Sequence, residues 1–270
     1  MIDLDRQAYP YLEDVNEGIL RHFAPADGAP ERVLDVGCGQ AGLAAEIRRL
    51  GHVVWGIEAS PIAVAKAAAR IDRCIHTDLL DGKAVEALLG GERFDAIVFS
   101  GVLEHLYDPL ATLRFYLRFL RPDGRLLVSV PNALNWQTRL AFLLGRFEYQ
   151  DTGVMDRTHV RFFTFRSAKR LLTAAGCSIE KTDLTPHLVR AFLPIIKKAL
   201  ADRASAAGRD RARSSLDSPS FRFYRRWVYP LEYAVASCWK PMLAFRIVLV
   251  ARSPREAAVP APAARLVAHR

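Results

Sequence analysis

Val33-Leu-Asp-Val-Gly-Cys-Gly-Gln-Ala-Gly42 is the stretch that decides the fold. It starts as a short apolar run, and glycines follow at 37, 39 and 42. Glycine lets the backbone turn sharply and approach a ligand because it has no Cβ. A loop of this kind joins a buried strand to a helix at the carboxyl end of the strand, where open α/β sheets bind ligands. The stretch therefore predicts a nucleotide-type site near the start of an α/β domain.

Apolar runs and helical spacings alternate around this loop. The runs are nearly continuous, which is typical of parallel strands buried on both faces. Pro122-Asp123-Gly124 predicts a turn before the fifth strand. Ser60-Pro61 predicts a helix start with a Ser cap and Pro in the first position. Strands are expected at 32–36, 53–57, 74–77, 94–99 and 125–130, and helices at 41–50, from 60 onward, at 85–89 and at 109–120.

The rest of the chain divides into segments of different character. We expect an N-terminal helical segment over 1–30 with its helix at 10–23, and a core domain over 31–185. The core ends with an irregular stretch at 131–165, a helix at 166–175 that stops at Gly176, and a strand at 177–183. A basic and aromatic helical insertion over 186–243 follows, then a last strand within 244–252. The tail at 253–270 is rich in Ala, Pro and Arg, and disorder is expected there.

Composition narrows the class of protein. The 270 residues are 51% hydrophobic and 25% charged, as in a packed globular protein. The sequence shows no apolar run of about 18 residues and no signal-peptide pattern at its start, so we expect a cytoplasmic protein. Its four cysteines are scattered without a CxxC pair, which predicts neither a zinc site nor a disulfide framework. No metal is expected.

The net charge of +9 is concentrated in the C-terminal third. Residues 186–270 contain 16 Lys and Arg against 5 Asp and Glu. An anionic partner such as a membrane surface, a phosphorylated substrate or a nucleic acid would explain this excess. A solvated, Arg-rich surface explains it equally well.

Two carboxylates suggest what the glycine loop binds. Glu58 ends the second predicted strand, where a carboxylate can accept hydrogen bonds from both ribose hydroxyls. This pattern fits NAD as well as other nucleosides. Asp35 stands just before the glycines, where it repels a pyrophosphate but suits a ligand that carries an amino group.

The loop and the motifs after it resemble class I methyltransferases that use S-adenosylmethionine. VLDVGCGQAG is similar to their first motif, FDAIVFSGVLEHLYDP (94–109) to their fourth-strand motif, and LRPDGRLLVSVPN (120–132) to the segment that follows. The resemblance covers about 30–184 and the final strand. Ala41 departs from the usual glycine spacing, but its methyl group is small enough for the turn to survive. The cofactor-binding residues that the resemblance implies are Asp35, Gly37 and Gly39 toward the methionine, Glu58 at the ribose, Asp78 and Leu79 at the adenine, and Ser100, Gly101 and Val102 beside the methyl group.

The resemblance implies a Rossmann-like, doubly wound sheet of seven strands with the last one antiparallel. It also implies S-adenosylmethionine as cofactor and O-methylation of a small-molecule, glycan or lipid-linked acceptor. An NAD-dependent oxidoreductase stays open as an alternative from the glycine loop alone. A non-catalytic scaffold that binds a membrane or an acidic partner also stays open.

Two histidines are candidates for the base that accepts the proton of an acceptor hydroxyl. His105 follows the fourth strand in Leu-Glu-His, and it could instead pack over the cofactor as a helix-start residue. His159 lies in MDRTHVRFFT (155–164), which is similar to the DRTHxRFF stretch of bacterial glycan and secondary-metabolite methyltransferases. Four further residues are candidate acceptor-binding groups: Asn132, Asp156, Arg157 and Arg161. Alternatively, Asp156 and Arg161 could pair with each other, and Asn132 could cap a turn.

The insertion admits three interpretations. Its aromatic and basic residues suit a lid over the sheet, a peripheral contact with the inner face of a membrane, or single-stranded nucleic acid. Nucleic acid is the least favoured because the sequence contains no recognisable RNA-binding motif. Trp136, Phe142 and Phe147 have helical spacing and are interpreted as core or lid packing.

Overall fold

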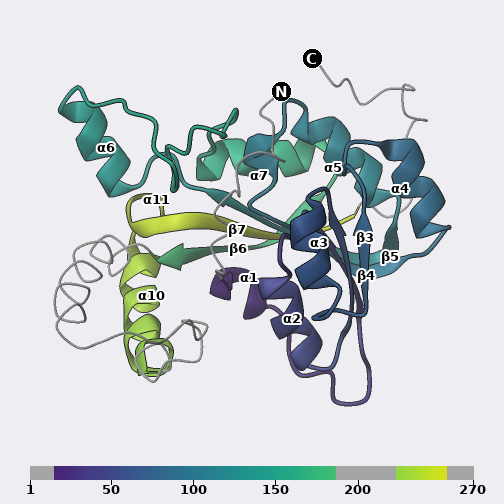
Figure 1. Ribbon diagram of the computed structural model, residues 1–270. Helices are drawn as coiled ribbons and strands as arrows, with labels where there is room; N and C mark the ends of the chain where they lie inside the picture. The colour runs from purple at the N-terminus through teal and green to yellow at the C-terminus, as the bar shows by residue number, and fades with distance from the viewer. Residues whose placement is uncertain (1–14, 187–222, 254–270) are drawn as a thin grey trace, which may run out of the picture.

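One seven-stranded sheet forms the centre of the computed structural model, which describes residues 15–186 and 223–253 (Figure 1). Its strand order is β3-β2-β1-β4-β5-β7-β6. The strands are β1 (Arg32–Val36), β2 (Val53–Glu58), β3 (Arg73–His76), β4 (Phe94–Ser100), β5 (Leu120–Pro131), β6 (Ser178–Pro186) and β7 (Ala244–Arg252). The pairs among β1 to β5 are parallel, and β7 runs antiparallel to both β5 and β6. The expected Rossmann-like sheet with an antiparallel last strand is confirmed.

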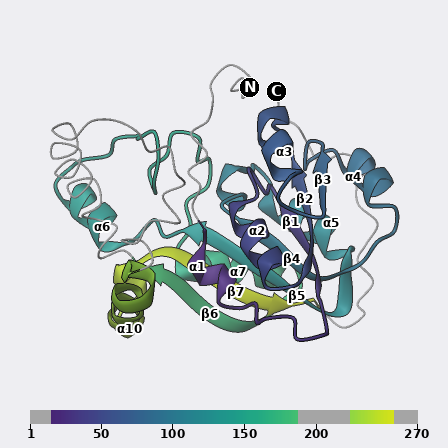
Figure 2. The ribbon, with the colours of Figure 1, turned by 60° about the horizontal axis from the view of Figure 1, so that its bottom comes forward.

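Helices cover both faces of this sheet (Figures 1 and 2). On one face lie α1 (Glu17–Leu20), α2 (Gly42–Arg49) and α3 (Pro61–Ala67); on the other lie α4 (Gly82–Leu89), α5 (Pro109–Leu117) and α7 (Phe165–Ala174). Each face has its own buried apolar cluster, and β1 contributes Val33 to one and Leu34 to the other. Burial on both sides is the reason these strands are apolar throughout.

Several element boundaries differ from the sequence-based predictions. Helix α5 ends at Leu117 instead of residue 120, and β5 begins at Leu120 instead of residue 125. Phe94 pairs with Leu120 and Ala96 with Arg125, so the predicted Pro-Asp-Gly turn lies at a register shift within the strand. The helix predicted at 10–23 is a single turn, α1, in its described part. The predicted cap at Ser60 is confirmed, because its side chain accepts from the Ala63 N–H.

Helix α6 (Trp136–Leu143) was missed, because 131–165 was expected to be irregular. Asn135 caps it by accepting from the N–H groups of Gln137 and Thr138. Thr138 is its buried residue, whereas Leu143 is 82% exposed. The interpretation of Phe142 and Phe147 as packed residues is wrong, since they are 40% and 59% exposed and stack on each other.

The described part of the insertion, residues 223–243, is helical as predicted. It contains a π-helical turn η3 (Tyr224–Val228), α10 (Tyr229–Cys238) and α11 (Lys240–Leu243). Ala236 of α10 packs against Leu184 of β6. The rest of the insertion, the first 14 residues and the predicted disordered tail from residue 254 onward lie outside the described residues. Among the helices that are described, none is long and apolar enough to cross a membrane.

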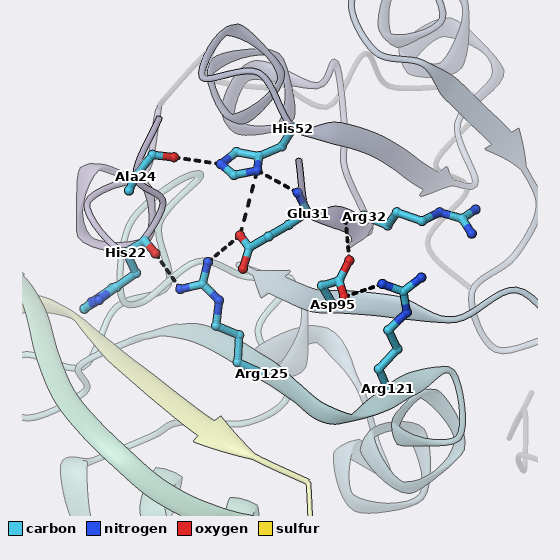
Figure 3. Close-up of polar contacts among 8 residues, drawn as sticks. All are labelled: His22, Ala24, Glu31, Arg32, His52, Asp95, Arg121 and Arg125. Atoms are coloured by element: carbon cyan, nitrogen blue, oxygen red, sulfur yellow. Dashed lines mark hydrogen bonds and ion pairs between the residues drawn. The ribbon is translucent and has the colours of Figure 1, made fainter. Parts of the chain in front are cut away.

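A polar network connects the amino-terminal ends of the central strands (Figure 3). Arg125 donates to a Glu31 carboxylate oxygen at 2.6 Å and to the His22 carbonyl at 2.5 Å. Asp95 accepts from the Arg32 N–H at 2.8 Å and from Arg121 at 2.5 Å. The network ties the segment before β1 to the starts of β1, β4 and β5. The glycine loop lies at the opposite, carboxyl-terminal ends of the strands.

A buried carboxylate, Asp183 in β6, joins three elements. It pairs with His22 at 3.0 Å and accepts from the Tyr233 hydroxyl at 2.7 Å. The Arg21 guanidinium lies 3.8 Å from the carboxylate and 3.7 Å from the centroid of the Tyr233 ring. Burial disfavours ionisation of Asp183, but the hydrogen bonds from His22, Tyr233 and the Leu184 N–H and the charge of Arg21 outweigh it and hold its pKa below the ordinary value.

We expect Asp183→Ala to lower the free energy of unfolding by about 3 kcal/mol, because it leaves several buried partners uncompensated. The matched control is Glu180→Ala on the same strand, which removes an exposed pair with Arg252 and should cost much less. Urea unfolding measures both. The lowered pKa means that the Asp183 contribution is complete above the ordinary aspartate pKa, about 3.9, and is lost as pH falls through the lower folded value. Equal losses in the two variants at neutral pH would contradict this role.

Candidate active site

The glycine loop turns at the carboxyl end of β1. Gly37 has a φ of +72°, and a Cβ placed there would lie 2.7 Å from a methyl carbon of Val102. The N–H groups of Gly37 and Cys38 both donate to the Ile57 carbonyl, so the loop is fixed against β2. Ala41 has a φ of +60°, a left-handed conformation that glycine adopts more readily. The turn survives with alanine, as predicted.

Gly37→Ala is expected to destabilise the protein by about 1–2 kcal/mol or more, because the left-handed conformation and the contact with Val102 both oppose a Cβ. Gly42→Ala is the matched control in the same loop. Gly42 is the first residue of α2, has ordinary helical φ, and a Cβ there meets no atom within 4 Å. Thermal unfolding should show a lower midpoint for the first variant and an unchanged or higher one for the second. Similar losses in both would contradict the assigned geometry.

Two carboxylates border the loop as predicted. Glu58, 7% exposed, accepts from the Gly39 N–H at 2.9 Å and from the Ser60 N–H at 2.8 Å, so it braces the loop at the end of β2. Asp35 is 3% exposed, and burial together with the nearby Glu58 raises its pKa to about 7. A buried carboxylate with a raised pKa fits a ligand that brings a positive charge, such as the amino group of S-adenosylmethionine, because that charge would favour ionisation.

The remaining predicted cofactor residues also lie at the carboxyl ends of the strands. Asp78 is exposed after β3 and accepts from the Leu80 N–H, and Leu79 beside it is half-buried. Gly101, with a φ of +75°, follows β4 between Ser100 and Val102.

Two residues missed by sequence reasoning hold these segments in place. Tyr116 of α5 donates its hydroxyl to the Leu79 carbonyl at 2.9 Å. Asn16, buried just before α1, donates to the Ser100 Oγ at 3.0 Å. Both contacts join residues that are distant in the sequence, so no local pattern signals them.

The two candidate bases are brought together. His105 lies in the short 3-10 helix η1 (Leu103–His105) after β4, and its ring centroid is 4.8 Å from that of His159. The Glu104 backbone carbonyl accepts from the N–H groups of Val160 and Arg161, which anchors the loop of His159 beside η1. The sequence separates these histidines by more than fifty residues, yet one site contains both.

Burial sets the charge state of this histidine pair. It lowers the pKa of His105, and the neighbouring His159 lowers it further. Burial also lowers the pKa of His159. The adjacent Glu104 is 3% exposed, and burial raises its pKa to about 7. The neutral form of both imidazoles is therefore favoured at neutral pH. A side chain that accepts a proton has to be in this form.

The structure corrects part of the predicted acceptor site. Asn132 is 1% exposed and donates to the carbonyls of Pro241 and Ala244, so it ties β5 to the start of β7 instead of facing an acceptor. Asp156 is 3% exposed and accepts from Thr158. Arg161, the alternative partner of Asp156, donates to the Tyr107 carbonyl. Arg157 is exposed and pairs with Asp151.

Three residues of the site could hold a metal ion. Glu104, His105 and His159 each offer one ligand atom, and these atoms lie within 4.8 Å of one another. Asp108, which lies nearby in the sequence, caps α5 instead. The prediction that no metal takes part remains a prediction.

A family model described as a methyltransferase domain matches residues 6–182. The chain belongs to the class I S-adenosylmethionine-dependent methyltransferases. Among its relatives, the ubiquinone biosynthesis O-methyltransferase of Cereibacter sphaeroides (strain ATCC 17025 / ATH 2.4.3) is 32% identical over 127 residues, 45% of this chain and 51% of the relative. The protein of the same name from Xanthomonas oryzae pv. oryzae is 36% identical over 125 residues, 45% and 50% of the two chains. The chain thus spans about half the length of these relatives.

Solved structures of other proteins share the fold. A SAM-dependent methyltransferase from Archaeoglobus fulgidus superposes with a TM-score of 0.54 at 14% identity, covering 87% of this chain and 91% of that one. The [4+2]-cyclase SpnF superposes with a TM-score of 0.53 at 21% identity, covering 88% and 80%. At these identities the likeness concerns the fold alone. S-adenosylmethionine is the cofactor of this methyltransferase family, and the NAD alternative is not favoured.

Proposed function

We propose that this protein transfers the methyl group of S-adenosylmethionine to a hydroxyl oxygen of a small molecule, or of a glycan or lipid-linked acceptor. The observation that supports this most is the position of His105. It follows β4 directly, next to Ser100–Val102, where the cofactor's reactive end is expected. The relatives named as O-methyltransferases support the same reaction type. When bound, S-adenosylmethionine supplies a methyl group activated by its sulfonium charge.

The chain's own residues provide the binding site. Asp35 would pair with the amino group of the cofactor, and Glu58 would accept from the ribose hydroxyls while it braces Gly39. Asp78 and Leu79 would flank the adenine. Gly37 lets the loop pass close to Val102, where a larger side chain would clash. The cofactor fits these residues, because buried negative charge meets its positive charge.

Methyl transfer to a hydroxyl needs alignment and the loss of one proton. As an acceptor hydroxyl takes up the methyl group, its proton would pass to an imidazole nitrogen of this protein. We assign that role to His105, with His159 beside it to orient the acceptor. The exposed Arg157 would contact the outer part of an acceptor that carries negative charge. Arg161 would do the same from its position over the Tyr107 carbonyl.

Transfer of a radiolabelled methyl group to a panel of catechols, hydroxylated quinol precursors and sugar nucleotides tests this function. We expect labelled product from at least one hydroxylated acceptor and none from its fully O-methylated counterpart. Activity that a chelator abolishes and an added divalent ion restores would show that Glu104 and the two histidines work through a metal. Labelling on nitrogen or carbon alone would contradict the proposal.

A peripheral membrane contact is proposed for the end of the molecule that carries α6 and α10, which project from the same side in both views (Figures 1 and 2). Large apolar side chains are exposed there: Leu143, Leu144 and Phe147 near α6, and Trp227, Leu231 and Trp239 near α10. Exposed apolar groups beside the exposed Arg139 and Arg226 suit the headgroup region of an anionic bilayer. Co-sedimentation with anionic vesicles should fall in Leu143→Ser/Trp239→Ser and persist in Ile62→Ser, a variant on the distant helix α3. If the double variant, the Ile62→Ser variant and the unmodified protein all co-sediment equally, the proposed contact is contradicted.

A further inference from the structure

Thr158 lies between a buried carboxylate and the proposed base. Its hydroxyl donates to Asp156 Oδ1 at 2.6 Å, and its N–H donates to the same oxygen at 2.8 Å. On the other side, its Oγ1 and its backbone carbonyl oxygen are each 3.2 Å from His105 Nδ1. One residue thus links Asp156 to His105.

The directions of these hydrogen bonds determine where the His105 proton is. A hydroxyl has one proton, and that of Thr158 is engaged by Asp156, which as a carboxylate only accepts. The Thr158 carbonyl also only accepts. Both atoms near Nδ1 therefore offer it lone pairs, so Nδ1 has to carry the hydrogen. In a neutral imidazole the other nitrogen, Nε2, then carries a lone pair.

We propose that Asp156 and Thr158 are positioning residues that hold neutral His105 as the Nδ1–H tautomer and so keep Nε2 available to accept a proton. The catalytic meaning of this arrangement rests on the proposed function, whereas the tautomer itself does not. Asp156 acts through Thr158: its carboxylate keeps the hydroxyl from turning round and donating to Nδ1, which would stabilise the opposite tautomer.

His159 is oriented in the same way from another direction. Its Nδ1 is 3.0 Å from the Val154 carbonyl, which also only accepts, so its neutral form carries the hydrogen on Nδ1 too. Glu104 adds a buried carboxyl oxygen, Oε2, that has no hydrogen-bond partner among the described residues. Two imidazole lone pairs and this oxygen make a site rich in acceptors. It therefore favours a molecule that brings several hydroxyl donors over one that brings carboxylate or carbonyl groups.

Nitrogen NMR of the full chain with isotopically labelled histidine tests the tautomer at about pH 8, well above the ordinary histidine pKa. His105→Asn assigns the signals. We expect His105 of the unmodified protein to show protonated Nδ1 and unprotonated Nε2. The reverse pattern would overturn the proposal without any variant.

Three variants separate positioning from general structural support. Asp156→Ala frees the Thr158 hydroxyl, so the Nε2–H form should become populated. Adding Thr158→Val removes that hydroxyl while keeping the carbonyl, and it should restore the Nδ1–H form. Asp156→Asn still offers an acceptor oxygen and should retain the original tautomer. An unchanged tautomer in Asp156→Ala, or no restoration in the double variant, would overturn the role of Asp156, since a merely structural loss is not repaired by a second substitution.

An activity readout complements the spectra. In Asp156→Ala we expect kcat to fall at least tenfold with the KM for S-adenosylmethionine unchanged, and to recover in the double variant. If the predicted tautomers are found but the unmodified protein transfers no methyl group to any acceptor, the proposed function fails and the tautomer assignment stands. Methyl transfer with the opposite tautomer would leave the function intact and overturn this inference.

Discussion

Glu58→Gln is expected to weaken the binding of S-adenosylhomocysteine by at least about 100-fold. The carboxylate accepts from the N–H groups of Gly39 and Ser60, and it would also accept from the ribose. A neutral amide has only one acceptor oxygen, so it cannot replace all of these hydrogen bonds. Hydrogen bonds to a charged group contribute about 1.5–3 kcal/mol each, and one or two such losses give the stated factor. Calorimetric titration measures it.

The matched control for Glu58 is Glu46→Gln. Glu46 is a glutamate of α2 that pairs with Arg49 at 2.8 Å, outside the proposed site. Its variant should bind S-adenosylhomocysteine as the unmodified protein does. Thermal unfolding of both variants separates loss of binding from loss of fold. Affinity of Glu58→Gln within about threefold of the unmodified protein would contradict the assignment of this carboxylate.

His105→Asn should lower kcat for methyl transfer to a hydroxylated acceptor by about 100-fold to 10,000-fold, the usual contribution of a positioned general base. Binding of S-adenosylhomocysteine should hardly change, because the assigned cofactor contacts come from other residues. His76→Asn is the control, since His76 is exposed at the end of β3 and interacts with the Ala59 carbonyl. A larger loss in His159→Asn than in His105→Asn would reverse the two assigned roles.

The pH dependence of kcat gives a second check on His105. Burial and the neighbouring His159 lower its pKa, so the imidazole stays neutral down to a pH below the ordinary value of about 6.5. A base works only when unprotonated. The rate should therefore be level near neutral pH and fall as pH drops through this lowered pKa. The acid limb should disappear in His105→Asn.

Local sequence signals predicted the glycine turn and the carboxylates beside it because these features are built locally. The glycine loop, the carboxylates at the ends of β1 and β2, and the cap at Ser60 all depend on residues close together in the chain. Their conformations follow from glycine freedom, strand burial and capping. The Rossmann-like sheet followed from the same alternation.

The acceptor half was less predictable because tertiary contacts decide it. Arg161 was a candidate partner for Asp156, but the Tyr107 carbonyl lies within its reach. Asn132 was a candidate acceptor ligand, but β7 returns beside β5 and takes its hydrogen bonds. Helix α6 was missed because its apolar side chains do not form a buried face. No spacing rule in the sequence reveals which distant carbonyl will meet a given side chain.

Parallel calorimetric titrations of the unmodified protein with S-adenosylhomocysteine and with NAD test the central claim most directly. The account predicts binding of S-adenosylhomocysteine at micromolar or tighter affinity and no binding of NAD. Binding of NAD without S-adenosylhomocysteine would contradict it, because the buried Asp35 and the braced Glu58 would then serve a different nucleotide.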